Sequence, residues 1–474
     1  MLLNFTVSNY RSIRDEVSLT TLATRLDPER GIPVEVADDG TKVNVLPVLA
    51  ILGANASGKS NILRAMSTMR SIILNSASTP RYQTDSKESP TWVEPFLLDP
   101  KYADKPTLMH MEFVISGVRY QYGFEIFRGR VKEEWLHTFP HKRTQVLFDR
   151  EDTKEFQIGK NLGGRARVIS EITRPQVLFL SAAANAGHPL LSKIYNFFLR
   201  NLHLLDVRGR GEIDSSLIQR IMDRYEQSIK LLELADLGIS DAIVENNKVS
   251  PEDFEDRRNM FRDLVPYPDG MSEEEKEVEL DRIVNATLAD QFKFELLHQG
   301  SQGLMPLPYE DESHGTKSWL SFVTHALEAL ANGAVLLVDE LDASLHPLLL
   351  AEALRMFQSP KANVLGAQLI FTTHDVTLLG GDRGALEQYN LSRGQVWMVE
   401  KGRRGESSLT PLSDYRPRKG EDIQRGYLQG RYGGTPSIKS SISADVVRES
   451  TGVVRGNTVV GRGNTGVVRG SSHG

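Results

Sequence analysis

Eight consecutive residues near the start of the chain combine two glycines, a lysine and a serine at a spacing that suits phosphate binding. They fit the pattern G-x-x-x-x-G-K-[ST] and are Gly53, Ala54, Asn55, Ala56, Ser57, Gly58, Lys59 and Ser60. The apolar run 48–52 before them predicts a buried strand, and the residues from Asn61 onward predict a helix. A loop between a strand and a helix points backbone N–H groups inward at the positive end of the helix dipole, which favours phosphate.

These eight residues, together with Asn61, are therefore expected to bind a nucleotide. Lys59 would reach the β- and γ-phosphates, and the Ser60 hydroxyl would be a magnesium ligand. The alternative is a chance match in a glycine-containing turn, which leaves the strand and the helix on either side unexplained.

Two adjacent carboxylates follow a second apolar strand. The run 335–338 predicts this strand, and Asp339 and Glu340 come directly after it. Because parallel sheets bind their ligands at the carboxyl ends of the strands, Asp339 is expected to hold magnesium, directly or through a water. Glu340 is expected to orient and polarise an attacking water. Taken alone, the pair is equally well explained as an acidic turn, but the phosphate-binding pattern in the same chain favours an active site.

A single histidine follows another apolar strand. The run 368–372 predicts this strand, and His374 lies just beyond it. A lone histidine at the end of a strand usually has a structural role. The position of His374 one strand beyond the Asp-Glu pair favours a sensor of the γ-phosphate.

The composition is that of an ordinary globular chain, with 474 residues, 40% hydrophobic and 25% charged. The net charge of −6 and the pI near 6.1 create no overall basic field toward nucleic acid, although a local basic groove stays open. The absence of cysteine excludes disulfides and cysteine-bound zinc and fits a reducing compartment. No apolar run approaches about 20 residues and no leader pattern is present, so we expect a cytoplasmic protein without membrane segments.

The order of these patterns predicts an α/β fold whose nucleotide domain is split. Residues 1–165 are expected to form its N-terminal half, with a meander of antiparallel strands from about 92 to 150. Residues 166–300 predict a mainly helical insertion. Residues 301–436 predict the C-terminal half, with a helix near 347–358 and strands at 334–338, 368–372 and 396–399. Residues 437–474 partly repeat T-G-V-V-R-G, which predicts a disordered tail rather than a nucleic-acid-binding segment.

Taken together, these stretches resemble ABC-type ATPases of the SMC, RecF and OLD-like branch rather than transporters. Residues 53–60, the Asp339-Glu340 pair and His374 correspond to the Walker A, Walker B and switch-histidine elements. The stretch N-Y-R-S-I at 9–13 is similar to the N-F-R-S opening of that branch, which implies that Arg11 lies near the nucleotide. The Q-loop glutamine of the family has two candidates, Gln83 and Gln121, and the sequence does not decide between them.

Three further stretches extend the resemblance. Residues 312–317 resemble the E-S-x-G-T stretch that replaces the transporter signature loop and completes the site of the other protomer, which implies a head-to-tail dimer. The residues that would act in trans are Ser313, His314, Gly315 and Thr316. Residues 342–347 are similar to the D-x-S-L-H-P segment, which implies a D-loop containing Ser344 and His346. Residues 426–433 resemble the Y-L-x-G-R-Y-G ending of AAA-family ATPases from abortive-infection and phage-defence loci, the RloA-like group.

The resemblance implies an ATPase that uses ATP and Mg²⁺ and forms a homodimer or a higher oligomer. The residues after His374 are too few for the nuclease domain of OLD-type proteins, and no long heptad array of SMC arms is present. We therefore expect a defence ATPase that controls a separate effector, a nuclease or toxin from the same locus. The alternative is a RecF- or SMC-like DNA-repair ATPase that clamps DNA. The signature-like loop disfavours a transporter subunit.

Overall fold

A computed structural model gives the architecture of most of the chain. It describes residues 1–25, 27, 29–77, 92–140, 143–152, 155–206, 220–235, 238–246, 251–262, 277, 280, 292–343, 345–379, 391–415 and 422–435. The chain divides into two units, Met1–Thr435 and Pro436–Gly474, and all the described residues belong to the first. The tail predicted to be disordered therefore lies outside the described residues.

A six-stranded sheet forms the centre of the first unit, in the order β11-β15-β16-β5-β17-β18. Its strands are β5 (Val48–Gly53), β11 (Leu202–Asp206), β15 (Val335–Asp339), β16 (Gln368–Thr373), β17 (Val396–Lys401) and β18 (Ser407–Pro411). The first five strands in this order pair in parallel, and β18 adds an antiparallel edge. Every residue of β5, β15 and β16 is buried, as expected for parallel strands that are covered on both faces.

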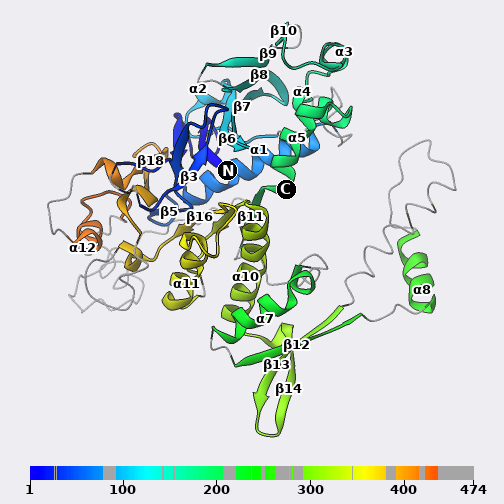
Figure 1. Cartoon of the computed structure of the whole chain (residues 1–474), viewed down its shortest axis with the longest axis vertical. Helices are drawn as coiled ribbons and strands as arrows, with labels where there is room; N and C mark the ends of the chain where they lie inside the picture. The colour runs from blue at the N-terminus through cyan, green and yellow to red at the C-terminus, as the bar shows by residue number, and fades with distance from the viewer. Residues whose placement is uncertain are drawn as a thin grey trace, which may run out of the picture. The chain divides into compact units, whose positions relative to one another are not determined.

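This sheet confirms the predicted α/β fold. Strands from distant parts of the sequence lie side by side in it, and Figure 1 shows the blue β5 beside the yellow β16. The strands predicted at 334–338, 368–372 and 396–399 are β15, β16 and β17, with their bounds shifted by one or two residues.

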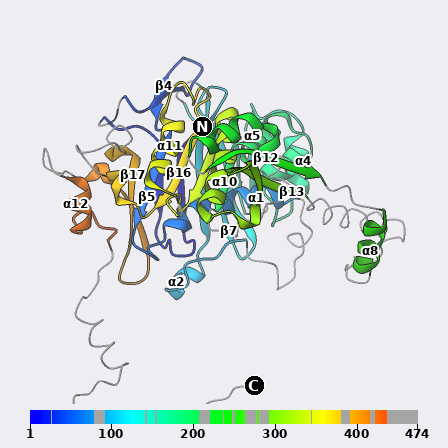
Figure 2. The same ribbon diagram turned by 90° about the horizontal axis from the view of Figure 1, so that it is seen from below.

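Helices cover both faces of the sheet. The helix α1 (Lys59–Asn75) packs on one face, where its apolar residues share a cluster with Leu49 and Ile51 of β5. The helices α10 (His314–Asn332) and α11 (Pro347–Gln358) pack on the other face, in a cluster that contains Val48, Ala50 and Leu52. Alternate residues of β5 thus pack into two different apolar clusters, because successive side chains of a strand point to opposite faces of the sheet. Figure 2 shows α11 beside β16 and β5.

A second sheet of seven antiparallel strands packs on the far side of α1. Its order is β10-β9-β8-β7-β6-β1-β2, and its strands are β1 (Leu2–Ser8), β2 (Val17–Thr20), β6 (Thr107–Ile115), β7 (Val118–Phe127), β8 (Arg130–Thr138), β9 (Gln145–Glu151) and β10 (Glu155–Ile158). The predicted meander is confirmed by β6 to β9. The side chain of Gln368 ties this sheet to the first one, because it accepts from Leu2 N at 2.6 Å and donates to Leu2 O at 3.0 Å.

The segment 166–300 contains both helices and strands. Its helices are α3 (Ala166–Ile172), α4 (Phe179–Asn185), α5 (Pro189–Arg200), α7 (Tyr225–Glu233) and α8 (Pro251–Arg262). Its strand β11 joins the central sheet, and β12 (Ile239–Asn246) and β13 (Phe292–Gly300) pair with β14 (Gly303–Pro308) in a three-stranded sheet. The helix α7 packs between β12 and α10. The limits of the insertion stay a prediction.

Smaller elements complete the described part of the chain. They are the hairpin of β3 (Ile32–Glu35) and β4 (Lys42–Val45), the short helix α2 (Pro100–Ala103) and the helix α12 (Ile423–Leu428). Among the described residues, no helix combines the length and the apolar character needed to cross a lipid bilayer.

Candidate active site

The phosphate-binding pattern folds as a strand, a loop and a helix. The strand β5 ends at Gly53, and α1 begins at Lys59. Gly58 has a φ of 107°, which glycine adopts readily, and a Cβ there would collide with the hydroxyl of Ser407. Among the described residues, no side chain caps α1 and none in its first turn is acidic. The start of this helix therefore keeps the positive potential that favours an anion.

The ammonium group of Lys59 lies over this loop. It donates to the carbonyl oxygens of Gly53 at 2.7 Å and Ala54 at 3.0 Å, and the residue is 5% exposed. The positive charge is therefore held directly beside the loop amides. An incoming phosphate would meet the charge and the N–H groups together.

Two hydroxyl groups and one carboxylate meet where α1, β15 and β16 come together. The Ser60 hydroxyl donates to Asp339 Oδ1 at 2.8 Å, and the Thr372 hydroxyl donates to the same oxygen at 2.7 Å. Asp339 is 4% exposed, so its carboxylate is removed from bulk water. The structure thus brings Ser60 and Asp339, which are far apart in the sequence, into direct contact.

The residue after Asp339 has an unusual backbone conformation. Glu340 has a φ of 53°, which costs a non-glycine residue on the order of 1 kcal/mol. Two bonds to Thr372 hold this backbone: Glu340 N donates to the threonine hydroxyl at 2.7 Å, and Leu341 N donates to its carbonyl at 3.1 Å. The turn directs the Glu340 side chain toward His374, whose Nε2 lies 3.7 Å from Glu340 Oε1. Both side chains remain partly exposed, at 23% and 36%, so water can reach them.

Hydroxyl and amide side chains from three parts of the chain support the loop. The Ser407 hydroxyl donates to Ser57 O at 2.6 Å and lies 2.8 Å from the Ser12 hydroxyl. Asn61 Nδ2 donates to Ser12 Oγ at 2.7 Å. Ser12 could be predicted from the sequence, because it follows Arg11 in the N-Y-R-S-I stretch. No local motif indicates Ser407 or Thr372, because each reaches the site through strand pairing.

Arg11 lies in the turn that carries Ser12. Its φ is 50°, its guanidinium group lies 3.1 Å from Glu94 Oε1, and its Cζ is 5.7 Å from the centre of the Tyr10 ring. The turn places Arg11 one residue from the hydroxyl that supports the loop. Its contact with a nucleotide stays a prediction.

The signature-like residues occupy the start of α10. Ser313 caps this helix by accepting from Thr316 N at 3.0 Å, and the two hydroxyls are 2.9 Å apart. Ser313 and His314 are exposed, Gly315 is half-buried, and Thr316 is buried. The Glu312 carboxylate before them lies 2.6 Å from Nε2 of His298 on β13. Because Ser313 and His314 are exposed, a second molecule can reach the start of α10.

The remaining candidates are divided between the described and the undescribed residues. The exposed His346 caps α11, since its Nδ1 accepts from Leu348 N at 3.3 Å. Ser344 lies outside the described residues, as does Gln83. Gln121 is on β7, where its side chain donates to Glu112 Oε1 at 2.7 Å.

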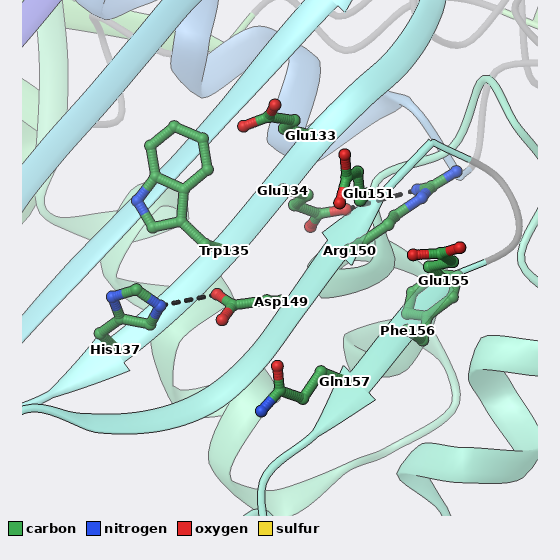
Figure 3. Close-up of a pocket in the computed structure, with 10 residues that line it drawn as sticks. All are labelled: Glu133, Glu134, Trp135, His137, Asp149, Arg150, Glu151, Glu155, Phe156 and Gln157. Atoms are coloured by element: carbon green, nitrogen blue, oxygen red, sulfur yellow. Dashed lines mark hydrogen bonds and ion pairs between the residues drawn. The ribbon is translucent and has the colours of Figure 1, made fainter.

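A cavity of about 720 Å³ lies on the antiparallel sheet rather than at the loop. Figure 3 shows its lining, which β8, β9 and β10 provide. Its polar side chains already pair with one another: His137 Nε2 lies 2.6 Å from Asp149 Oδ1, and the buried Arg150 lies 3.5 Å from Glu134. None of the residues predicted for nucleotide chemistry lines this cavity. The candidate site is therefore the group around Lys59, Ser60 and Asp339.

One family model matches the part of the chain that contains these elements. Residues 48–380 match the model of a family described as "AAA domain, putative AbiEii toxin, Type IV TA system". The match begins at the first residue of β5 and includes the loop, Asp339, Glu340 and His374. No curated protein matches the sequence. One similar solved structure is cbiO1 from Clostridium perfringens, described as part of the ABC transporter complex cbiONQ, with 11% identity over 87% of this chain and 90% of that chain and a TM-score of 0.24.

Proposed function

Because the chain belongs to this AAA-domain family, an ABC-type ATPase group linked to abortive infection, we propose that it hydrolyses ATP and thereby controls a separate effector protein. The proposal rests above all on the contact between Ser60 and Asp339 beside the lysine of the loop. A serine and a carboxylate joined in this way are a pair of oxygen ligands next to a phosphate-binding loop.

Nucleotide binding would use the loop and the start of α1. The N–H groups of residues 53–61 would donate to the phosphate oxygens, and Lys59 would exchange its bonds to the carbonyls of Gly53 and Ala54 for bonds to phosphate oxygens. Such charge-assisted bonds are stronger than the ones they replace. Arg11, in the adjacent turn, is proposed to contact the same nucleotide.

The donor set around Asp339 fits magnesium. The ion prefers oxygen ligands and is commonly bound by one or two protein groups together with phosphates and waters, so Ser60 and Asp339 would hold it. When bound, it would neutralise charge on the phosphates. Within the described ranges, no group of three or more acidic or histidine side chains offers an alternative metal site.

Hydrolysis would depend on Glu340 and His374. The Glu340 carboxylate is partly exposed, and its backbone is fixed by Thr372, so it can orient a water for attack in line with the leaving phosphate. His374 lies beside it and is proposed to contact the γ-phosphate. The two residues thus act on the same end of the nucleotide.

A second copy of the chain would complete the site. We infer that Ser313, His314, Gly315 and Thr316 at the start of α10 bind the phosphates held by the partner, since this helix start is exposed and capped by a neutral serine. His346, at the exposed start of α11, and Ser344 are proposed to lie in the same interface. ATP would then join two copies head to tail, in the cytoplasm, and no membrane partner is needed.

The lysine of the loop provides the first test. Lys59→Ala is expected to raise the dissociation constant for Mg-ATP by about 100-fold or more, because a buried charge-assisted contact is lost. Binding of a fluorescent ATP analogue measures this change, and Lys361→Ala, which alters an exposed lysine, is the matched control. Equal affinities in Lys59→Ala and in the unchanged protein would remove the nucleotide site from this loop.

The effector part of the proposal is tested by purification with the proteins encoded beside this chain. A toxin or nuclease companion that is released or retained according to the nucleotide supports control of an effector. ATP-dependent DNA binding that falls steeply with salt, in the absence of such a companion, would favour a DNA clamp instead.

A further inference from the structure

The last described segment of the chain closes on the beginning of the phosphate-binding loop. We call Asp422–Thr435 the C-terminal hook, which consists of α12 and the turn after it. The hook carries the sequence Y-L-Q-G-R-Y-G, which the proposed function leaves without a role. Asp422 caps the helix α12, because its carboxylate accepts from Arg425 N at 3.0 Å.

Two side chains hold Gly434, near the end of the hook. Gly434 N donates to Glu400 Oε1 at 2.9 Å, and the Tyr427 hydroxyl donates to Gly434 O at 3.0 Å. Glu400 belongs to β17, the strand next to β5, and Tyr427 belongs to α12. Both polar groups of one buried glycine are thus satisfied by side chains from two different elements.

Gly434 lies directly against Gly53, the first residue of the phosphate-binding loop. A Cβ on Gly434 would lie 3.3 Å from Gly53 Cα, and its φ of 70° also favours glycine. Gly53 also lies against β17, because a Cβ on it would collide with the carbonyl oxygen of Val399. Gly53 is therefore in close contact with both Val399 and Gly434.

The hook is also anchored in the core beneath the loop. The side chains of Tyr427 and Tyr432 are 6% and 4% exposed and belong to the same apolar cluster as Leu52 and Met398. The Tyr432 ring packs edge-on against Tyr415 at 5.5 Å. These contacts attach the hook firmly to the core of the protein.

The position of Gly53 matters because this residue begins the loop whose N–H groups are proposed to bind phosphate, and its carbonyl oxygen accepts from Lys59 Nζ at 2.7 Å while the site is without nucleotide. A chain of contacts thus runs from Glu400 and Tyr427 through Gly434 to Gly53, where the phosphate-binding loop begins. A loop that is held in place before binding loses less freedom when the ligand arrives. Loosening the hook would therefore weaken binding.

We propose that the C-terminal hook clamps the phosphate-binding loop, with Glu400 and Tyr427 as positioning residues for nucleotide binding. They act through Gly434 on Gly53 and do not touch the reacting atoms. The inference rests on the proposed function, because the position of the loop matters in this way only if the loop binds ATP.

The test compares Glu400→Ala, Tyr427→Phe and Glu400→Gln, with Glu171→Ala on the surface of α3 as the control. Glu400→Ala and Tyr427→Phe are each expected to raise the dissociation constant for Mg-ATP and the KM about 5- to 10-fold, the effect of one lost hydrogen bond on loop position. The kcat and the melting temperature without nucleotide should change little. Glu400→Gln keeps an oxygen that accepts from Gly434 N, so it should restore nearly normal affinity.

Two results would overturn the clamp. One is an affinity in Glu400→Ala and Tyr427→Phe within twofold of the control. The other is a kcat that falls while KM stays constant, since a positioning role in binding cannot produce it. If Glu400→Ala does not fold, Tyr427→Phe, which removes one oxygen atom, decides alone. Lys59→Ala is measured alongside: if it too binds ATP normally, the proposed function fails rather than the clamp.

Discussion

Thr372 connects the acidic residues of β15 to the neighbouring strand. It is fully buried, its hydroxyl donates to Asp339 Oδ1, and its hydroxyl oxygen accepts from Glu340 N. A hydroxyl has one proton and two lone pairs, so these two bonds are mutually compatible. One side chain thereby fixes both the carboxylate proposed to hold the metal and the strained backbone of the proposed base.

Glu340 can be tested without disturbing this arrangement. Glu340→Gln keeps the shape of the side chain but removes the basic oxygen, so ATP affinity should change less than twofold while turnover falls by about 100-fold or more. Single-turnover hydrolysis and ATP binding measure the two effects, and light scattering should detect an ATP-bound dimer that persists.

The control for this variant is Glu310→Gln, which alters an exposed glutamate in the turn before α10. Unchanged turnover in Glu340→Gln would remove Glu340 from its assigned role. A loss of ATP binding would instead show that the glutamate supports the site rather than the chemistry.

The sequence could predict some of these side chains and not others for a physical reason. Asp339 and His374 lie just after strongly apolar runs, and Lys59 and Ser60 belong to a loop pattern with fixed spacing, so local sequence predicts their place. Thr372 and Ser407 reach the site because β16 pairs with β15 and β18 pairs with β17. Such pairings join residues that are distant in sequence, so a local pattern does not contain them.

The same distinction applies to whole strands and helices. β5, β15 and β16 are continuous apolar runs, and α11 has regular helical spacing, so each was predictable. β8 lies inside the predicted meander but has a weaker pattern, because its buried Glu134 breaks the alternation of apolar and polar residues. β11 is a strand because it pairs with β15, and β12 and β13 are strands because they pair with each other and β13 pairs with β14.

Glu134 on β8 joins the antiparallel sheet to α4. Its carboxylate accepts from the N–H groups of Phe179 at 2.6 Å and Leu180 at 3.0 Å, at the start of that helix. Arg150 on β9 lies 3.5 Å away and donates to Val177 O at 2.7 Å, and both side chains of the pair are fully buried. Figure 3 shows the two side chains pointing toward each other from adjacent strands.

Removing the arginine should destabilise the protein strongly. Burial raises the pKa of the Glu134 carboxyl, and the Arg150 guanidinium and the two N–H groups act against this rise. Arg150→Met leaves the carboxylate buried without its cation, which costs about 3–5 kcal/mol and should lower the melting temperature by several degrees at pH 7.

The loss of stability caused by Arg150→Met should depend on pH. A glutamate whose pKa in the folded protein is raised above its unfolded value costs stability above that pKa and ceases to do so once it is protonated. The deficit of Arg150→Met should therefore shrink as the pH falls from 7 toward the unfolded value of 4.5. Arg128→Met, which breaks an exposed pair with Asp104, should change the melting temperature little at any pH. A pH-independent deficit would mean that lost packing, not the unpaired carboxylate, causes the effect.

For the chain as a whole, the candidate site and the signature-like helix start are both accessible. Glu340 and His374 are partly exposed, and Ser313 and His314 are exposed at the start of α10. Two copies arranged head to tail around a twofold axis would form two equal sites, each with the loop of one copy and the helix start of the other. This arrangement would make the function of one copy dependent on its partner.

Mixing two inactive variants tests that dependence. Lys59→Ala lacks the loop lysine, and Ser313→Arg blocks the start of α10, so each should be nearly inactive alone. In an equal mixture half of the dimers contain one of each, and each mixed dimer has one intact site, so about a quarter of normal ATPase activity should return. A mixture of Lys59→Ala and Glu340→Gln should stay inactive. Lys59 and Glu340 of one site come from the same copy, so each site of a mixed dimer carries one of the two changes. If differently tagged copies of Lys59→Ala and Ser313→Arg co-purify as mixed dimers and no activity returns, Ser313 does not act on the partner's nucleotide.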